Sequence, residues 1–185
     1  MTTKLPATMR AVKITVPGGA EVLAMIHMPV PRPSAGQLLL RVDAVGVNRA
    51  DIILRQPDLP LPVSQRPDIP GLEVAGTVVA VGEGVDGAHL GAAICALVPG
   101  AGGYADYCLV PAALAWPAPA RLSKPQAAAL PEGLLTIWNA LFDEPVLLPG
   151  ETLLVHGASS GIGAIAIMMA RAFGAEVLGT AGSDE

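Results

Sequence analysis

The sequence is poor in aromatic residues, in charge and in cysteine. Its cysteine content and its charge exclude several classes of protein. Aromatic side chains make up 3% of the 185 residues and charged side chains 15%. The two cysteines, Cys95 and Cys108, cannot supply a disulfide framework or a zinc ribbon, and we take the compartment to be reducing. A net charge of −5 and a pI near 5.1 give no basic surface for nucleic acid or an anionic membrane.

Long apolar runs are missing as well. None reaches the length that spans a membrane, and the first six residues carry no signal-peptide core, so we expect a cytoplasmic protein. Hydrophobic residues nevertheless make up 52% of the chain, which predicts a globular fold and excludes a disordered one.

The chain is organised around residues 153–163, which read Leu-Leu-Val-His-Gly-Ala-Ser-Ser-Gly-Ile-Gly. The apolar run predicts a buried parallel strand, the glycines predict a tight turn, and the residues that follow predict a helix to about Phe173. A second apolar segment at 176–180 completes a βαβ unit. Such a unit is typical of the opening of a dinucleotide-binding domain.

Small residues in this turn would let a pyrophosphate approach the backbone N–H groups at the start of the helix. The spacing G-x-G-x-x-G is met only at Gly163, whereas G-x-x-x-G-x-G is met by Gly157, Gly161 and Gly163. A glycine-rich turn without a ligand is the alternative. The predicted cofactor contacts are Ala158, Ser159, Ser160, Gly161, Ile162 and Gly163.

The second glycine spacing is also that of the short-chain dehydrogenases. That family has the turn near its N-terminus, whereas about 150 residues precede it here. Catalysis in that family also needs a Tyr-x-x-x-Lys pair, but Tyr104 and Tyr107 are followed four positions on by Cys108 and Pro111. The N-terminal part must therefore supply the chemistry.

Short strands dominate the N-terminal part and indicate a small β-barrel or sandwich. Asn48 and Asp51 can cap a short helix to about Arg55, and the five prolines from Pro57 to Pro70 predict a surface loop at the rim of a cleft. The predicted strands are 9–15, 22–28, 37–47, 71–82, 93–98 and 104–110, and two helices follow at 126–130 and 132–142, the first capped by Ser123.

Six segments, taken in order, carry a family resemblance: 46–51 (GVNRAD), 70–76 (PGLEVAG), 81–85 (VGEGV), 128–132 (AALPE), 155–163 (VHGASSGIG) and 180–183 (TAGS). The chain resembles the medium-chain dehydrogenase/reductase superfamily and, within it, the zinc-free quinone oxidoreductases. The resemblance implies an α/β plus β fold, in which a GroES-like β-barrel substrate domain (1–122) is followed by connecting helices (123–148). The first βαβ unit of a Rossmann cofactor domain (149–185) would then be incomplete, since such a domain has about six strands.

The resemblance also bears on metal binding. In the zinc alcohol dehydrogenases of this superfamily, Cys, His and Cys hold the catalytic zinc. The corresponding positions here are Asn48, Leu72 and Glu132, and a leucine cannot ligate a metal. No zinc is therefore expected, and Glu132 can instead cap the helix that follows Pro131.

The implied reaction is hydride transfer from NADPH to a quinone or another conjugated enone, which needs close placement more than a Lewis acid. Asn48 is the predicted polar group at the substrate carbonyl, with Asp51 and Arg55 beside it as further catalytic residues. Thr136 matches the family position near the nicotinamide amide. Asn48 could instead only cap its helix, and Asp51 could only pair with an arginine.

NADPH is favoured over NADH because Ala181 stands where NAD enzymes place an acidic residue, and Ser183 could bind a 2′-phosphate. Asp184 and Glu185 would count against NADPH if they folded back toward the ribose. The resemblance implies a homodimer for the full-length protein. Two alternatives stay open: an enoyl reductase of the same superfamily, and a non-catalytic chain that keeps the β domain as a binding or assembly module.

Overall fold

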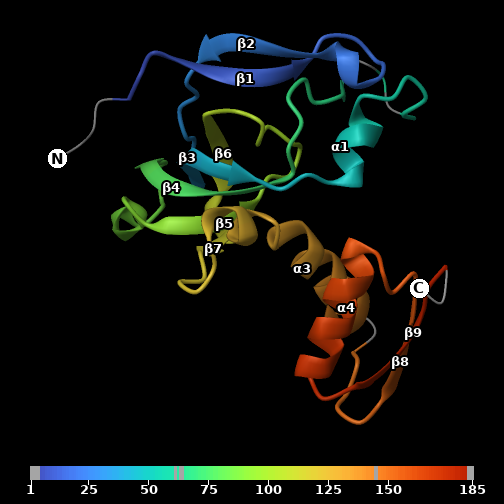
Figure 1. Cartoon of the computed structure of the whole chain (residues 1–185). Helices are drawn as coiled ribbons and strands as arrows, with labels where there is room; N and C mark the ends of the chain where they lie inside the picture. Colours follow the sequence, from blue (N-terminus) through green and yellow to red (C-terminus); the bar gives the residue numbers. More distant parts are fainter. Residues whose placement is uncertain (1–4, 61, 63–64, 144–145, 183–185) are drawn as a thin grey trace. The chain divides into compact units, whose positions relative to one another are not determined.

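The computed structural model describes residues 5–60, 62, 65–143 and 146–182 (Figure 1). The chain divides into two compact units, Met1–Pro131 and Glu132–Glu185. The division falls inside the predicted connecting segment 123–148.

The first unit opens with an antiparallel hairpin, as the sequence predicts. Strands β1 (Thr8–Ile14) and β2 (Leu23–Pro29) pair along their whole length, and a 3₁₀ turn at Ala20–Val22 leads into β2. In Figure 1 this hairpin, in blue, lies along one side of the sheet that follows. A single bridge between Ala11 and Ala105 joins β1 to the chain before β6.

A five-stranded antiparallel sheet forms the centre of the first unit. The sequence predicts its four longer strands and misses the three-residue β7, which is too short to show an alternating pattern. The predicted strand at 104–110 also begins too early, because the Tyr104 carbonyl and the Asp106 N–H bond to Val12 and Arg10 of β1 instead. The strand order is β6 (Tyr107–Pro111), β3 (Gln37–Val45), β4 (Glu73–Val81), β5 (Ala93–Leu97) and β7 (Ala115–Pro117).

The sheet buries a continuous core of its own. The side chains of Leu38, Leu40, Val74, Val78 and Val110 are almost fully removed from water. Each side chain of this kind contributes about 1.5–3 kcal/mol when it is fully buried. Packing within the first unit therefore fixes the strand ends from which its loops leave.

Short helices begin at the predicted caps. Helix α1 (Arg49–Leu54) follows Asn48, and α2 (Lys124–Ala128) follows Ser123, whose N–H donates to the Gln126 side chain at 2.9 Å. Helix α3 (Pro131–Trp138) ends in a π-helical turn at Asn139–Asp143.

The second unit contains the predicted βαβ motif. Strands β8 (Thr152–His156) and β9 (Glu176–Thr180) pair in parallel, and α4 (Gly161–Ala172) connects them. Its small core centres on Ile137, Val155 and Ala166. Within the described ranges, no helix is both long and apolar enough to cross a membrane.

Candidate functional site

Three loops of the first unit meet at one buried carboxylate, Asp51 of α1, which is 6% exposed. It accepts hydrogen bonds from the Asn48 N–H at 2.8 Å, the Gly71 N–H at 2.8 Å and the Tyr104 hydroxyl at 3.1 Å. Asp51 thus ties the start of α1 to the entry of β4 and to the turn before β6. We call Asn48, Asp51, Gly71, Glu73 and Tyr104 the Asp51 cluster.

The backbone around Gly71 has room for no side chain. Gly71 has a φ of +102°, and a Cβ there would lie 2.7 Å from the Tyr104 nitrogen and 2.8 Å from the Gly103 Cα. Only glycine allows this approach without moving backbone atoms. The close approach brings the Gly71 N–H and the Tyr104 hydroxyl to the same carboxylate.

Tyr104 acts as a donor in this cluster. Burial of the phenol, followed by the negative charge and the hydrogen bond of Asp51, raises the pKa of Tyr104 well above its usual value. The hydroxyl therefore keeps its proton at physiological pH and continues to donate to Asp51.

Asn48, the predicted polar group at the substrate carbonyl, is half-buried and has a second carboxylate beside it. Its Nδ2 donates to Glu73 Oε1 at 2.9 Å, and Glu73 is 3% exposed. A Cβ at Gly46 would collide with the Glu73 carboxylate, so the glycine makes room for it. The structure brings Asn48 and Asp51 together as predicted, while the catalytic roles of both stay predictions.

Arg55, the third predicted catalytic residue, contacts the turn after β1. Its Nη1 donates to the Gly18 carbonyl at 2.9 Å, and the Gly18 N–H donates to the Arg55 carbonyl at 2.7 Å. These two bonds fix the end of α1 to the hairpin. The contacts favour a structural role for Arg55, and its catalytic role stays a prediction.

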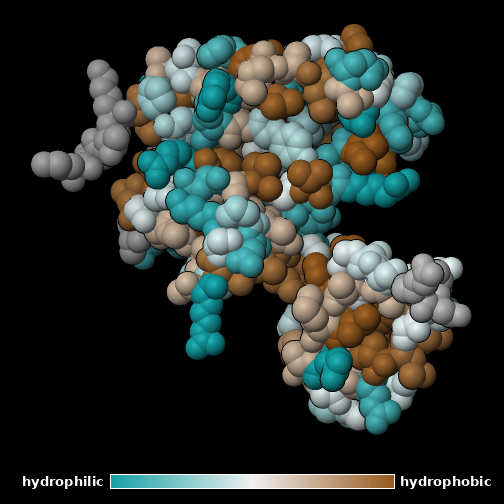
Figure 2. All heavy atoms as spheres, viewed as in Figure 1, coloured by the Kyte–Doolittle hydropathy of each residue, from teal (hydrophilic) through white to brown (hydrophobic). Residues whose placement is uncertain are grey.

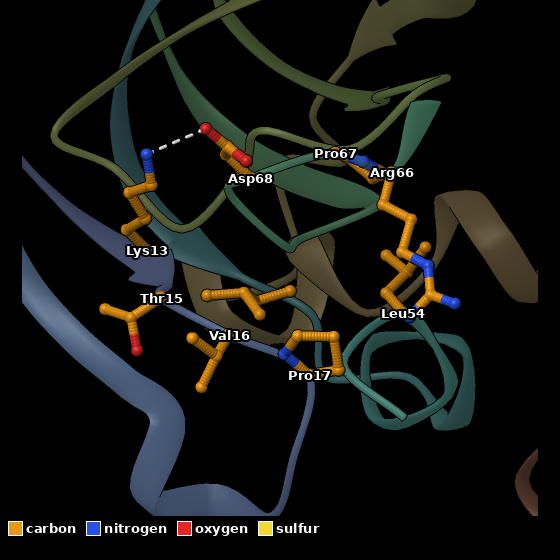
Figure 3. A pocket seen from close by; sticks show the side chains of 9 residues that line it. Lys13, Thr15, Val16, Pro17, Leu54, Arg66, Pro67 and Asp68 are labelled. Atoms are coloured by element: carbon orange, nitrogen blue, oxygen red, sulfur yellow. Dashed lines mark ion pairs between the residues drawn. The ribbon is translucent and has the colours of Figure 1, made fainter. Parts of the chain in front are cut away.

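A cavity of about 210 Å³ lies beside α1 in the first unit (Figure 3). Lys13 and Asp68 face each other across one side and form an ion pair of 2.9 Å, while Leu54 and Arg66 line the opposite side. None of the predicted catalytic residues lines this cavity. It is therefore separate from the Asp51 cluster.

Arg66 organises the described part of the proline-rich loop. Its guanidinium donates to the carbonyls of Gln56, Pro57 and Leu59 at 2.7–3.0 Å. These bonds hold the start of the loop against its end, which agrees with the predicted loop between α1 and β4.

The glycine turn of the second unit has the close packing that a phosphate-binding turn needs. The Gly163 N–H donates to Ser160 Oγ at 3.0 Å, so Ser160 caps α4. A Cβ on Gly163 would lie 2.9 Å from the Ala158 Cα and would strike the Gly157 carbonyl. Gly157 itself has a φ of +68°.

The start of α4 leaves donors available. Among the described residues, nothing accepts the N–H groups of Gly161 and Ile162, as expected for the first turn of a helix. These N–H groups and the positive end of the helix dipole suit an anion such as a pyrophosphate. Ser159 and Thr136 are exposed and leave their hydroxyls open to a ligand. The predicted 2′-phosphate contact, Ser183, lies outside the described residues.

At the positions that the resemblance matches to zinc ligands, the expected absence of zinc stays a prediction. Leu72 has no donor atom, and the Asn48 amide nitrogen is engaged by Glu73. Among the residues that the structure describes, no group of three His, Cys, Asp or Glu side chains could hold a metal ion. His156 instead bonds through Nδ1 to the Thr180 hydroxyl at 3.1 Å.

Sequence reasoning missed the partners of Asp51 and Asn48. Gly71, Tyr104 and Glu73 lie 20, 53 and 25 residues from the groups they contact. No short-range pattern links them. The only local sign is the glycine at position 71, which a strand entry rarely needs unless another backbone lies close.

Known proteins match the chain over almost its whole length. A family model described as the alcohol dehydrogenase GroES-like domain matches residues 34–120. A quinone oxidoreductase of Rattus norvegicus is 38% identical over 181 residues, which cover 96% of this chain and 54% of that protein. The chain thus spans about half the length of the curated relatives it matches.

Two solved structures are similar to this chain in fold over almost its whole length. A mycobacterial protein solved in complex with NADPH is 32% identical, with a TM-score of 0.75 over 95% of this chain and 53% of that chain. An NAD-dependent alcohol dehydrogenase is 33% identical, with a TM-score of 0.83 over 95% of this chain and 59% of that chain. The predicted fold class, a GroES-like domain followed by the opening of a Rossmann domain, is confirmed.

Proposed function

The chain belongs to the quinone oxidoreductase family of the medium-chain dehydrogenase/reductase superfamily, and from that premise we propose that the whole protein transfers a hydride from NADPH to a quinone or another conjugated enone. The observation that carries the proposal is the half-buried Asn48, whose side-chain Nδ2 donates to the buried Glu73 carboxylate and whose backbone N–H donates to the buried Asp51 carboxylate. A neutral donor in this place suits an acceptor whose oxygen gains charge during the reaction.

The glycine turn would hold the cofactor. When bound, NADPH supplies the hydride. The free N–H groups of Gly161 and Ile162 would bind its pyrophosphate, and Gly163 keeps the turn narrow enough for that approach. Ala158, Ser159 and Ser160 complete the proposed wall of this site. Thr136 would bind the nicotinamide amide, and Ser183 the 2′-phosphate.

The Asp51 cluster would bind the acceptor. Asn48 Nδ2 would donate to the carbonyl oxygen on which negative charge develops, and a preorganised donor of this kind is worth about 10²–10³ in kcat. Asp51 would hold the Asn48 backbone in place through its 2.8 Å hydrogen bond. Arg55 would fix the other end of α1. Since Leu72 has no donor atom, we assign no zinc to the reaction.

The cytoplasm and a homodimer complete the proposal. Both cysteines are buried and unpaired, which fits a reducing compartment. An enoyl reductase would use the same motifs on a different enone, so the choice of acceptor must come from assays with both substrate classes.

A titration and a single substitution test this proposal. In the full-length protein, NADPH should bind at least about tenfold more tightly than NADH by calorimetry, because a 2′-phosphate contact adds roughly 1.4 kcal/mol or more. Asn48→Ala should lower kcat with a quinone by about 10²-fold and leave NADPH affinity unchanged. Equal turnover of Asn48→Ala and wild type would remove Asn48 from the mechanism.

A further inference from the structure

Glu73 is a buried carboxylate to which the proposed reaction assigns no role. It is 3% exposed at the first position of β4, and burying a carboxylate costs several kcal/mol unless hydrogen bonds compensate. One of its oxygens accepts the Asn48 Nδ2–H at 2.9 Å. Gly46 keeps the space for this carboxylate free of any side chain.

An ionised carboxylate can only accept hydrogen bonds. An asparagine amide beside it must therefore turn its nitrogen toward the carboxylate, because the reverse orientation would set oxygen against oxygen. The amide oxygen of Asn48 then faces the first turn of α1, where a capping residue accepts a backbone N–H. Among the residues that the structure describes, none accepts a hydrogen bond from the second Nδ2–H of Asn48.

We infer that Glu73 is a positioning residue, which sets the orientation of the Asn48 amide so that its second Nδ2–H is presented to the carbonyl oxygen of the acceptor. The inference rests on the proposed function for the acceptor and on the Asn48–Glu73 hydrogen bond for the orientation. Without Glu73 the amide could turn over and present its oxygen, which would repel the developing negative charge.

Amide resonances of the ¹⁵N-labelled 185-residue chain test the orientation directly. In the wild-type chain, one Nδ2 proton of Asn48 should lie clearly downfield of the other, because it is bound to a carboxylate. In Glu73→Gln this separation should shrink, because a glutamine can pair with either end of the Asn48 amide. Glu83→Gln, at an exposed carboxyl after β4, should leave the Asn48 resonances in place.

Turnover of the full-length protein tests the consequence. Glu73→Gln should lower kcat by roughly three- to tenfold, and Glu73→Met should lower it by about as much as Asn48→Ala, with NADPH affinity unchanged. The double variant Asn48→Ala with Glu73→Met should lose no more than Asn48→Ala alone, because both act through one donor.

The two measurements separate the inference from the proposed function. Unchanged Asn48 resonances in Glu73→Gln, or losses of turnover that multiply in the double variant, would overturn the positioning role. If wild-type protein reduces no quinone, the proposed function fails, while the amide resonances still decide whether Glu73 orients Asn48.

Discussion

The two units of the chain differ in how far each buries its own hydrophobic side chains. In the first unit, eight buried residues from four strands and Val98, which follows β5, form one core. The second unit leaves Leu154 of β8 53% exposed, Met168 of α4 62% and Leu178 of β9 60%. Figure 2 shows hydrophobic side chains, in brown, gathered on its visible face.

This difference indicates that the proposed acceptor site and the proposed cofactor site lie in units of unequal stability. The Asp51 cluster adjoins the five-stranded sheet, which has a buried core of its own. The glycine turn belongs to two strands and one helix that make few buried contacts. Stability that varies across a structure appears as local unfolding at the weaker part. The second unit should therefore unfold first.

Each unit carries one tryptophan, which makes the comparison measurable. Trp116 packs against the Ala75 and Cys95 region of the first unit, and Trp138 belongs to the second unit, where its ring contacts Phe142 and Phe173. Trp138→Phe and Trp116→Phe give single-tryptophan chains whose fluorescence follows one unit at a time.

The largest expected effect is on the stability of the first unit, which has the larger core. Asp51→Ala should destabilise the first unit by about 3–5 kcal/mol, because it leaves three donors in a buried site without their acceptor. Urea unfolding followed by Trp116 should show the loss. Asp58→Ala, in the exposed loop after α1, is the control and should change little. A loss below 1 kcal/mol for Asp51→Ala would mean that the cluster does not hold the loops.

The next effect concerns the second unit and separates the role of the glycine turn in stability from its role in cofactor binding. Gly163→Ala should cost about 2–3 kcal/mol in unfolding followed by Trp138, because its Cβ would strike backbone atoms of residues 157 and 158. Gly161→Ala meets nothing within 4 Å and should leave stability unchanged. Both should weaken NADPH binding by the full-length protein. Unaltered affinity in both would remove the turn from the cofactor site.

The cysteines report opening of the first unit alone. Burial raises the pKa of Cys108 to about 12 and also raises that of Cys95. At pH 8 both thiols should react with iodoacetamide at least about 100-fold more slowly in the native chain than in the unfolded chain. Protection should persist at urea concentrations that have already changed the Trp138 signal. Loss of protection together with that signal would show that the units open as one.

The smallest effect concerns pH. The hydrogen bond and charge of Arg10 lower the pKa of Asp106, so this pair stabilises the first unit above the unfolded pKa of about 3.9 and loses that effect as pH falls through the lower folded value. The Arg10 side chain is 64% exposed and the Asp106 side chain 35%, so water screens the pair and Asp106→Asn should lower Tm at pH 7 by at most about 2 °C. The difference from wild type should shrink as pH falls below the unfolded pKa of about 3.9 and close once Asp106 is protonated in both states, and a constant difference would point to another cause.

Local patterns predict the elements of both units well. Asn48 and Asp51, three residues apart, predict the start of α1, and the 153–180 segment predicts β8, α4 and β9 because each step depends on neighbouring residues. The three-residue β7 escapes prediction because it is held by pairing with β5, which no pattern within it reveals.

Local sequence patterns do not predict the contacts of the candidate site. Asp51 meets Tyr104, and Asn48 meets Glu73, only because the sheet brings the ends of distant strands together. A sequence shows which residues can donate or accept, but the fold decides which of them meet. The resemblance to a family supplied Asn48 as a candidate, and the structure supplied the carboxylates that hold it.

The most direct test of the proposed function is NADPH consumption by the full-length protein in the presence of a quinone. We predict quinone-dependent loss of NADPH absorbance that a zinc chelator leaves unchanged and that is slower with NADH. No consumption above the rate without protein, under conditions where NADPH binds, would contradict the proposed function.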